Sequence, residues 1–138
     1  MPDNLTVEQR SYCMSRVRGK DTGLEKVVRS ALHRQGYRFS KHPSGLPGKP
    51  DIVFPSAKVA VFVDGDFWHG YRFPAWRAQL TPFWQRKIRE TRERDQRNFA
   101  RLRRAGWVVV RIWQHEVKRD LAACVSRIAD ALRAARPE

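Results

Sequence analysis

Two short apolar runs separated by a turn dominate the middle of the sequence, at residues 52–54 and 59–63. Asp51 precedes the first run, and Asp64 follows the second. Apolar runs on either side of a short turn predict a β-hairpin. Because strand side chains alternate with a period of two, Asp51 should lie opposite about Phe62, with Asp64 one pleat further along the same face.

The predicted hairpin therefore carries two carboxylates side by side at one end. No basic residue stands within either strand to neutralise them. Neighbouring carboxylates repel each other unless a proton or a hard cation lies between them, and oxygen ligands suit Mg²⁺. His69 follows closely enough to share the site. The alternative is that Asp51 caps a turn and that Asp64 and Gly65 form an ordinary turn pair.

Net charge narrows the class of partner. The 138 residues carry a formal net charge of +14, which favours a polyanionic partner, and we expect nucleic acid. A membrane surface is the competing interpretation, but no predicted helix combines a Lys/Arg face with a strong, bulky apolar face and free ends. No apolar run reaches the roughly 18 residues of a membrane span either. The length and the 41% hydrophobic content predict one domain over residues 1–138. Cys13 and Cys124 suggest no disulfide framework, the N-terminus is unlike a signal peptide, and a cytoplasmic location fits.

Helical patterns precede the hairpin. Residues 5–18 can form a basic helix with few apolar positions, so residues 1–20 are expected to be a DNA-contacting helix or arm; a loosely packed arm is the alternative. Thr22 and Glu25 form a capping box that opens a helix ended by Gly36. Glu25 lies on the border of the inward face and could reach the hairpin, although capping alone explains a glutamate here. The inward face is predicted to consist of Leu24, Val28, Ala31, Leu32 and Gln35.

A long helix is predicted from Pro82 to about Ala105. Its helical spacing points Asp95 inward, where an unpaired charge is costly, so this carboxylate needs an arginine, a histidine or a hydrated metal nearby. The rest of the inward face is predicted to be Phe83, Trp84, Ile88, Thr91, Phe99 and Leu102. The outer face is strongly basic, which favours phosphate contact over a merely solvated face; its basic residues are Arg86, Lys87, Arg89, Arg92, Arg94, Arg97, Arg101, Arg103 and Arg104.

The remaining segments complete an α/β pattern. Strands are predicted at residues 37–42 and 107–113, the second of the apolar kind that is buried between layers. Residues 43–50 form a glycine- and proline-rich loop whose amides can approach a phosphate. Residues 71–81 are expected to be irregular, and residues 121–135 helical. This order predicts a mixed sheet flanked by helices.

Several of these motifs occur together in known nucleases. The segment from Pro50 to Asp64 resembles the hairpin of restriction-endonuclease-like enzymes, with Asp66 where their usual lysine would stand. Residues 61–69, Val-Phe-Val-Asp-Gly-x-Phe-Trp-His, resemble the very short patch repair (Vsr) endonucleases. The resemblance runs from about residue 8 to 115 and includes Met14, Asp21-Thr22-x-x-Glu25-Lys26, Leu46-Pro47-Gly48-Lys49-Pro50-Asp51, Phe83-Trp84-x-x-Lys87-Ile88, Glu93-Arg94-Asp95 and Gly106-Trp107.

The resemblance implies a restriction-endonuclease-like fold and hydrolysis of a DNA phosphodiester beside a thymine–guanine mismatch. It implies that Asp51 and the backbone carbonyl of Val63 bind Mg²⁺. It makes His69 the general base for the attacking water, with Glu25 as its orienting partner, and it makes Asp95 a holder of metal-bound water. These roles suit phosphodiester hydrolysis, which needs an oriented nucleophile and a cation near the developing charge.

Two departures from the family pattern bear on metals. The family often has a histidine where this chain has Asp64, so Asp64 is expected to be a catalytic carboxylate and a direct metal ligand. The family also typically carries a structural zinc, but the matching places hold Asp66, Tyr71 or a neighbour, Phe73 or a neighbour, and His115. Structural zinc sites need about four nitrogen or sulfur ligands, so no structural zinc is expected.

DNA contacts are expected on both sides of the site. The resemblance implies that Phe67 and Trp68 wedge between base pairs from one groove, while Met14 inserts from the other. Packing under the loop as core is the alternative for the two aromatics. Basic residues supply phosphate contacts. The expected DNA-contacting set is Met14, Arg16, Arg18, Lys20, Lys49, Phe67, Trp68 and Arg89.

Three functions remain open on the sequence. The first is a Mg²⁺-dependent mismatch nicking endonuclease that acts on double-stranded DNA as a monomer, at the bacterial nucleoid and with bacterial repair proteins as possible partners. The second is an endonuclease of the same chemistry with another target, such as a mobile-element or defence nuclease. The third is a DNA-binding module without catalysis, against which the set Glu25, Asp51, His69 and Asp95 argues.

Overall fold

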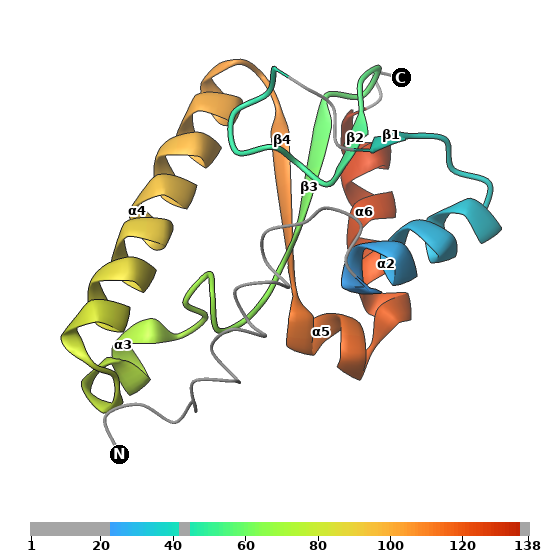
Figure 1. The fold of residues 1–138 in the computed structure, drawn as a ribbon. Helices are drawn as coiled ribbons and strands as arrows, with labels where there is room; N and C mark the ends of the chain where they lie inside the picture. Colours follow the sequence, from blue (N-terminus) through green and yellow to red (C-terminus); the bar gives the residue numbers. More distant parts are fainter. Residues whose placement is uncertain (1–22, 42–44, 136–138) are drawn as a thin grey trace.

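A four-stranded mixed sheet lies at the centre of the computed structural model, which describes residues 23–41 and 45–135 (Figure 1). Its order is β1-β2-β3-β4, with antiparallel pairing between β1 and β2 and between β2 and β3, and parallel pairing between β3 and β4. Helices flank the sheet, so the predicted fold class is confirmed. The strands are β1 Ser40–Lys41, β2 Ile52–Phe54, β3 Val59–Asp64 and β4 Val108–Trp113.

The predicted hairpin is formed by β2 and β3. Ile52 pairs with Val61, and Phe54 pairs with Val59. The backbone N–H of Asp51 donates to the carbonyl of Val61 at 2.9 Å, the residue that already pairs with Ile52, so the regular register ends at Ile52. The predicted alignment of Asp51 with Phe62 was therefore wrong, because Asp51 lies one residue out of register with the strand that follows it.

Helices cover both faces of the sheet, with α4 on one side and α2 and α6 on the other (Figure 1). On the α4 side, Phe62 packs against Phe99 with ring centroids 4.9 Å apart, and Ala60 and Leu102 join them. The opposite side holds the larger cluster, including Val28, Ile52, Val61, Ile112 and Ile128. The helices are α2 Gly23–Arg34, α3 Phe73–Trp76, α4 Pro82–Arg104, α5 Gln114–Arg119 and α6 Leu121–Ala135.

Some predicted elements differ in the structure. Residues 71–81 are more regular than expected, because they contain α3 and a 3₁₀ turn at Arg77–Gln79. Helix α5 is an additional element between β4 and α6. Within the predicted strand 37–42, only Ser40–Lys41 is paired, and residue 42 lies outside the described ranges. The predicted helix at 5–18 lies wholly outside them.

One burial prediction held only in part, and two were wrong. Strand β4 contacts α4 and α6 and buries Val110 and Ile112, but it is at the edge of the sheet and its Val108 is 43% exposed. Phe83 is 50% exposed instead of facing inward, because it sits in the first turn of α4. Gln35 is exposed just beyond the end of α2. Among residues 23–41 and 45–135, no helix has both the length and the apolar character that crossing a membrane requires.

Candidate active site

Asp51 and Glu25 form a buried acidic pair beside the hairpin. Asp51 is 5% exposed and its Oδ2 accepts the backbone N–H of Val63 at 2.7 Å. Helix α2 brings Glu25, 4% exposed, within hydrogen-bonding reach of the Asp51 carboxyl. Burial and the charge of Glu25 raise the pKa of Asp51 to about 8, although the Val63 hydrogen bond opposes the rise. The acidic pair therefore holds a proton or a cation far more readily than two solvated carboxylates would.

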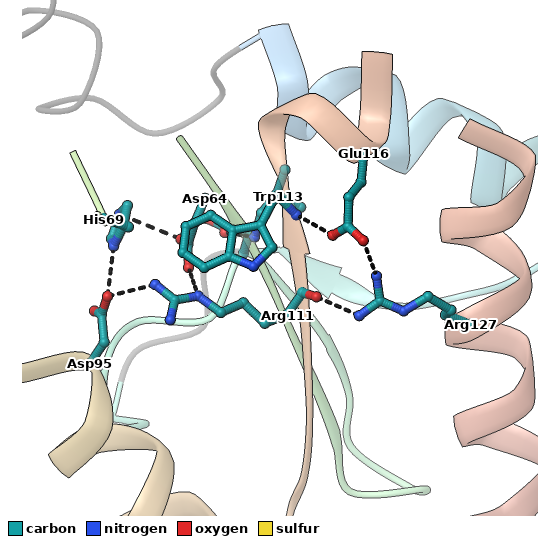
Figure 2. A network of polar contacts seen from close by, with 9 residues as sticks. Asp64, His69, Asp95, Arg111, Trp113, Glu116 and Arg127 are labelled. Carbon is teal, nitrogen blue, oxygen red and sulfur yellow. Dashed lines mark hydrogen bonds and ion pairs between the residues drawn. The ribbon is translucent and has the colours of Figure 1, made fainter. Parts of the chain in front are cut away.

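Asp64, His69 and Asp95 form a second group, here named the carboxylate–histidine cluster (Figure 2). His69 Nδ1 lies 2.8 Å from Asp95 Oδ2, and His69 Nε2 lies 3.5 Å from Asp64 Oδ1. One donor atom from each residue lies within 4.8 Å of the others, which is close enough to hold a metal ion. Asp64 ends β3, Asp95 lies on α4 and His69 lies in the loop between them, so three parts of the chain build the cluster.

The two groups are electrostatically connected. The charge of Asp64 is one of the causes that raise the pKa of Asp51. Burial raises the pKa of Asp64 itself, and this rise is partly offset by His69 and Arg111. Burial alone would lower the pKa of His69, but the hydrogen bond to Asp95 and the charge of Asp64 outweigh it and raise that pKa. His69 is therefore a base that stays protonated to a higher pH than a free histidine does.

Arg111 links two members of the cluster. Its Nε donates to Asp64 Oδ2 at 2.8 Å and its Nη2 donates to Asp95 Oδ2 at 2.7 Å (Figure 2). In the parallel register, Arg111 of β4 pairs with Phe62 of β3, two residues before Asp64. This register directs the guanidinium along the sheet toward the end of β3.

The loop that carries His69 is anchored at both ends. The N–H of His69 donates to the carbonyl of Gly65, and the N–H of Tyr71 donates to the carbonyl of Asp66 at 2.8 Å. Gly70 has φ +72° and packs so closely on α4 that a Cβ there would lie 2.8 Å from Cγ2 of Ile88. The left-handed backbone and the close approach both require glycine. They fix the direction in which His69 enters the cluster.

The sequence of the chain is similar to those of known DNA endonucleases. The sequence model of the DNA mismatch endonuclease Vsr family matches residues 2–74, which is more than half of the chain. The chain belongs to the Vsr endonuclease family. The "Type II nicking enzyme V.XorIIP" of Xanthomonas oryzae pv. oryzae is 46% identical over 134 residues, covering 96% of this chain and 98% of the relative.

Two further relatives are also named as DNA-cleaving enzymes. The "Type II nicking enzyme V.NmeDIP" of Neisseria meningitidis serogroup C is 37% identical over 134 residues, with 95% of this chain and 90% of the relative covered. The "DNA mismatch endonuclease Vsr" of Escherichia coli is 37% identical over 110 residues, with 76% of this chain and 69% of the relative covered. The sequence-based identification of a Vsr-like DNA endonuclease is thus confirmed at the level of the family.

The structure of this Vsr family member brings the predicted residues close together. However, the partners of His69 and Glu25 differ from the predicted ones. Asp95, rather than Glu25, is the carboxylate hydrogen-bonded to His69 Nδ1. Glu25 instead contacts Asp51 and forms an ion pair with Arg29 at 3.4 Å. Asp95 also has both kinds of partner that its inward position required, a histidine and an arginine. The metal-binding role expected for the Val63 carbonyl stays a prediction.

The donor set fits a divalent cation of the Mg²⁺ type. Asp51, Glu25 and Asp64 are 4–6% exposed and repel one another. Mg²⁺ prefers oxygen ligands and is commonly held by one or two carboxylates together with water. Asp51 and Asp64 would hold such an ion, which would replace the proton that burial otherwise favours on Asp51.

Arg111 is the site residue that sequence reasoning missed. The signal was present, because one arginine interrupts an otherwise apolar strand, and a charge in such a strand needs buried partners. The partners were hidden because they come from a parallel neighbour and a helix. Their identity depends on the β3–β4 register, which no local pattern in the sequence specifies.

Asp66 and His115 hold the loop against the start of α5. Asp66 Oδ1 lies 2.9 Å from His115 Nδ1, and the N–H of Asp66 donates to the side chain of Gln114 at 3.2 Å. The Tyr71 ring packs on His115 with centroids 4.3 Å apart. Two of the places that resemble the family's zinc ligands therefore form a direct acid–histidine contact, and the expectation that no zinc is bound stays a prediction.

The aromatic residues of the loop pack against α3 and the first turn of α4. Phe67 stacks on Trp76 with centroids 5.7 Å apart and meets Trp84 edge-on at 5.6 Å. Trp68 meets Trp84 at 6.1 Å. Phe67 and Trp68 are both partly exposed, so they contribute to a small core while presenting some ring surface.

Predicted DNA contacts divide between described and undescribed residues. Lys49 is exposed in the loop before Asp51 and adopts a left-handed backbone with φ 53°. Arg89 is exposed on α4 together with most of the basic residues of the outer face. Four of the predicted contacts lie outside the described residues: Met14, Arg16, Arg18 and Lys20.

Proposed function

We propose that this chain is a Mg²⁺-dependent endonuclease that nicks one strand of double-stranded DNA beside a thymine–guanine mismatch. The observation that carries the proposal is the orientation of His69. Nδ1 of its ring is hydrogen-bonded to Asp95, and Nε2 lies 3.5 Å from the buried carboxylate of Asp64. This is the arrangement expected of a general base that is fixed by an acid and faces a metal-binding carboxylate group.

In the proposed reaction, His69 Nε2 accepts a proton from the water that attacks the phosphorus atom. Asp95 holds the imidazole in the tautomer that leaves Nε2 free to accept. Glu25 supports Asp51, and Asp51 and Asp64 would hold the cation. The bound cation supplies positive charge for the developing charge on the phosphate oxygens. One base, one orienting acid and one cation suffice for hydrolysis of a single strand.

The exposed basic face of α4 supports the DNA-binding part of the proposal. Arg89 and its neighbours would neutralise phosphates, so binding should weaken steeply as salt is added. We propose that the enzyme acts on DNA as a monomer at the bacterial nucleoid. The wedge of Phe67 and Trp68 would recognise the mismatch, since a weakly paired step costs less to unstack.

A nicking endonuclease with another target is the second candidate. It is favoured by the names of the relatives with the highest coverage, which are type II nicking enzymes. Its chemistry at His69 and Asp51 would be the same. A DNA-binding module without catalysis is a poorer match, because the family and the oriented His69 both support hydrolysis.

The deciding experiment is cleavage of thymine–guanine and fully matched duplexes, with each strand end-labelled in turn. We expect one labelled strand to be cut beside the mismatch in Mg²⁺, with no cutting in EDTA. Asp51→Ala and His69→Ala should each slow cleavage by about 10²-fold or more. Asp130→Ala, on the exposed part of α6, is the control. Equal cutting of matched duplexes would favour the second candidate, and full activity in EDTA would refute the metal-dependent mechanism.

A further inference from the structure

The carboxylate–histidine cluster has the ligand atoms of a metal site, but the positively charged guanidinium of Arg111 is already bonded to its carboxylates. Its two carboxylates and one histidine offer oxygen and nitrogen atoms within 4.8 Å of one another. The Arg111 guanidinium occupies one atom of each carboxylate, Asp64 Oδ2 and Asp95 Oδ2. A divalent ion bound by this cluster would therefore lie close to the positive charge of the guanidinium, which would repel it.

Several contacts hold Arg111 in this position. The Cζ of its guanidinium lies 4.1 Å from the centroid of the Trp113 ring and 5.0 Å from that of Phe99. Both rings therefore attract its charge through their faces. The backbone carbonyl of Arg111 accepts from Arg127 Nη2 at 2.6 Å, and Arg127 is also paired with Glu116 at 3.1 Å (Figure 2). The arginine is thus fixed from its backbone to its tip.

The position of the guanidinium matters for charge. Asp64 and Asp95 contribute two negative charges to a site where side-chain exposures are 8% and 14%. Arg111 contributes one positive charge between these two carboxylates and donates a hydrogen bond to each of them. An ordinary ion pair would need only one carboxylate, whereas this guanidinium bridges two carboxylates that also flank His69.

We propose that Arg111 is the built-in cation of the carboxylate–histidine cluster. It is a positioning residue that stands where a second divalent ion would otherwise bind. It holds Asp64 and Asp95 around the imidazole and confines the divalent ion to the acidic pair and the free side of Asp64. This inference concerns the site of the proposed function, but its test needs no DNA and no cleavage.

The test replaces the arginine and asks whether a metal substitutes for it. Arg111→Met keeps an unbranched apolar stem and removes the guanidinium with its charge. Mn²⁺ serves as the probe, and its binding is counted by electron paramagnetic resonance, alongside thermal melts in EDTA and in Mn²⁺. We expect Arg111→Met to bind one more Mn²⁺ than the parent chain. We also expect Mn²⁺ at about 100 times its Kd to raise the melting temperature of the variant by roughly 9 °C more than that of the parent.

Two variants separate this role from a merely structural one. Arg111→Lys retains a cation and should bind the same number of Mn²⁺ ions as the parent. Arg133→Met removes an exposed arginine of α6 and controls for the change in net charge. The measured quantity is the number of Mn²⁺ ions bound by the variant minus the number bound by the parent, so any ion at the acidic pair cancels. Failure of the proposed metal mechanism would be seen separately, as a parent chain that binds no Mn²⁺. The inference is overturned if Arg111→Met gains no Mn²⁺ site, or if it stays unfolded at every Mn²⁺ concentration.

Discussion

Asp95 on α4 binds the Nδ1 side of His69 at 2.8 Å, while the opposite nitrogen of the same ring faces Asp64. The ring thus lies between the Asp95 carboxylate, which is hydrogen-bonded to it, and the Asp64 carboxylate, which is a proposed metal ligand. In the proposed reaction, these two carboxylates would have different tasks, one orienting the imidazole and the other facing the cation. Substitution of each acid should therefore have a different measurable effect.

Asp95→Asn should slow nicking by about 10²-fold while leaving the protein folded. Asparagine retains the shape, but it no longer stabilises a charged imidazole. Because the Asp95 hydrogen bond and charge help to raise the pKa of His69, their removal should lower that pKa. The base is active when neutral, so the acidic limb of the pH–rate profile should move to lower pH.

Single-turnover nicking from pH 5 to 9 measures this shift. Asp130→Asn, an exposed acid on α6, is the matched control and should leave the profile in place. A slowed Asp95→Asn enzyme with an unmoved acidic limb would count against the orienting role of Asp95.

Asp51 should make the metal-free protein less stable as pH rises. Burial and Glu25 raise its pKa from 3.8 to about 8 in the folded state. Between these values the folded chain keeps a proton that the unfolded chain releases, so the stabilising contribution is complete below about pH 4 and is lost as pH rises through about 8. The slope is at most about 1.4 kcal/mol per pH unit.

Asp51→Asn removes this ionisation and retains an acceptor for the Val63 N–H. We expect the variant to melt at a higher temperature than the parent at pH 8 in EDTA, with little difference at pH 4. Mg²⁺ should stabilise the parent and not the variant, which should also lose nicking. Melts across this pH range provide the measurement, and parallel curves for the two proteins would contradict the prediction.

Gly70→Ala should displace the loop that carries His69. Both Gly70 and Gly36 have positive φ, so alanine strains the backbone at either position. Only at Gly70 would the added Cβ also lie 2.7 Å from Cδ of Arg92 and 2.8 Å from Cγ2 of Ile88. We therefore expect Gly70→Ala to lower the free energy of unfolding by about 1–3 kcal/mol more than Gly36→Ala does.

Chemical denaturation of the two variants gives that difference, and nicking by the folded fraction reports the displacement of His69. Gly36→Ala should keep nearly full activity because open space surrounds the added methyl group. Equal losses of activity in both variants would show that backbone strain alone accounts for the effect.

Local patterns were enough to predict the parts of the site that depend on one element. The two apolar runs determined the hairpin formed by β2 and β3, although not the exact partner of Asp51. Helical spacing placed Asp95 inward and showed that it required a charged partner. In both cases the period of one strand or helix specifies the side chain's direction.

The features that were missed depend on how separate elements meet. Arg111 reaches Asp64 only through the parallel β3–β4 register, and the exchange of Glu25 for Asp95 beside His69 depends on where α2 and α4 cross the sheet. Phe83 matched the inward pattern of α4 but lies in its first turn, where the helix projects past the core. Tertiary packing, rather than local propensity, decides such positions.

Phe67→Ala should reduce discrimination between mismatched and matched DNA more than it reduces stability. Phe67 contacts Trp76 and Trp84 but is only partly buried, so its loss from packing should be modest. A wedge costs a few kcal/mol per unstacked step and costs least at a weak pair, so removing it should lower the ratio of nicking rates on thymine–guanine and matched duplexes by about tenfold or more. Phe39→Ala, which removes a partly buried ring that stacks on His33, is the control. If Phe67→Ala melts like the parent and keeps the same ratio, the aromatic wedge is wrong and a target other than the mismatch becomes the better explanation.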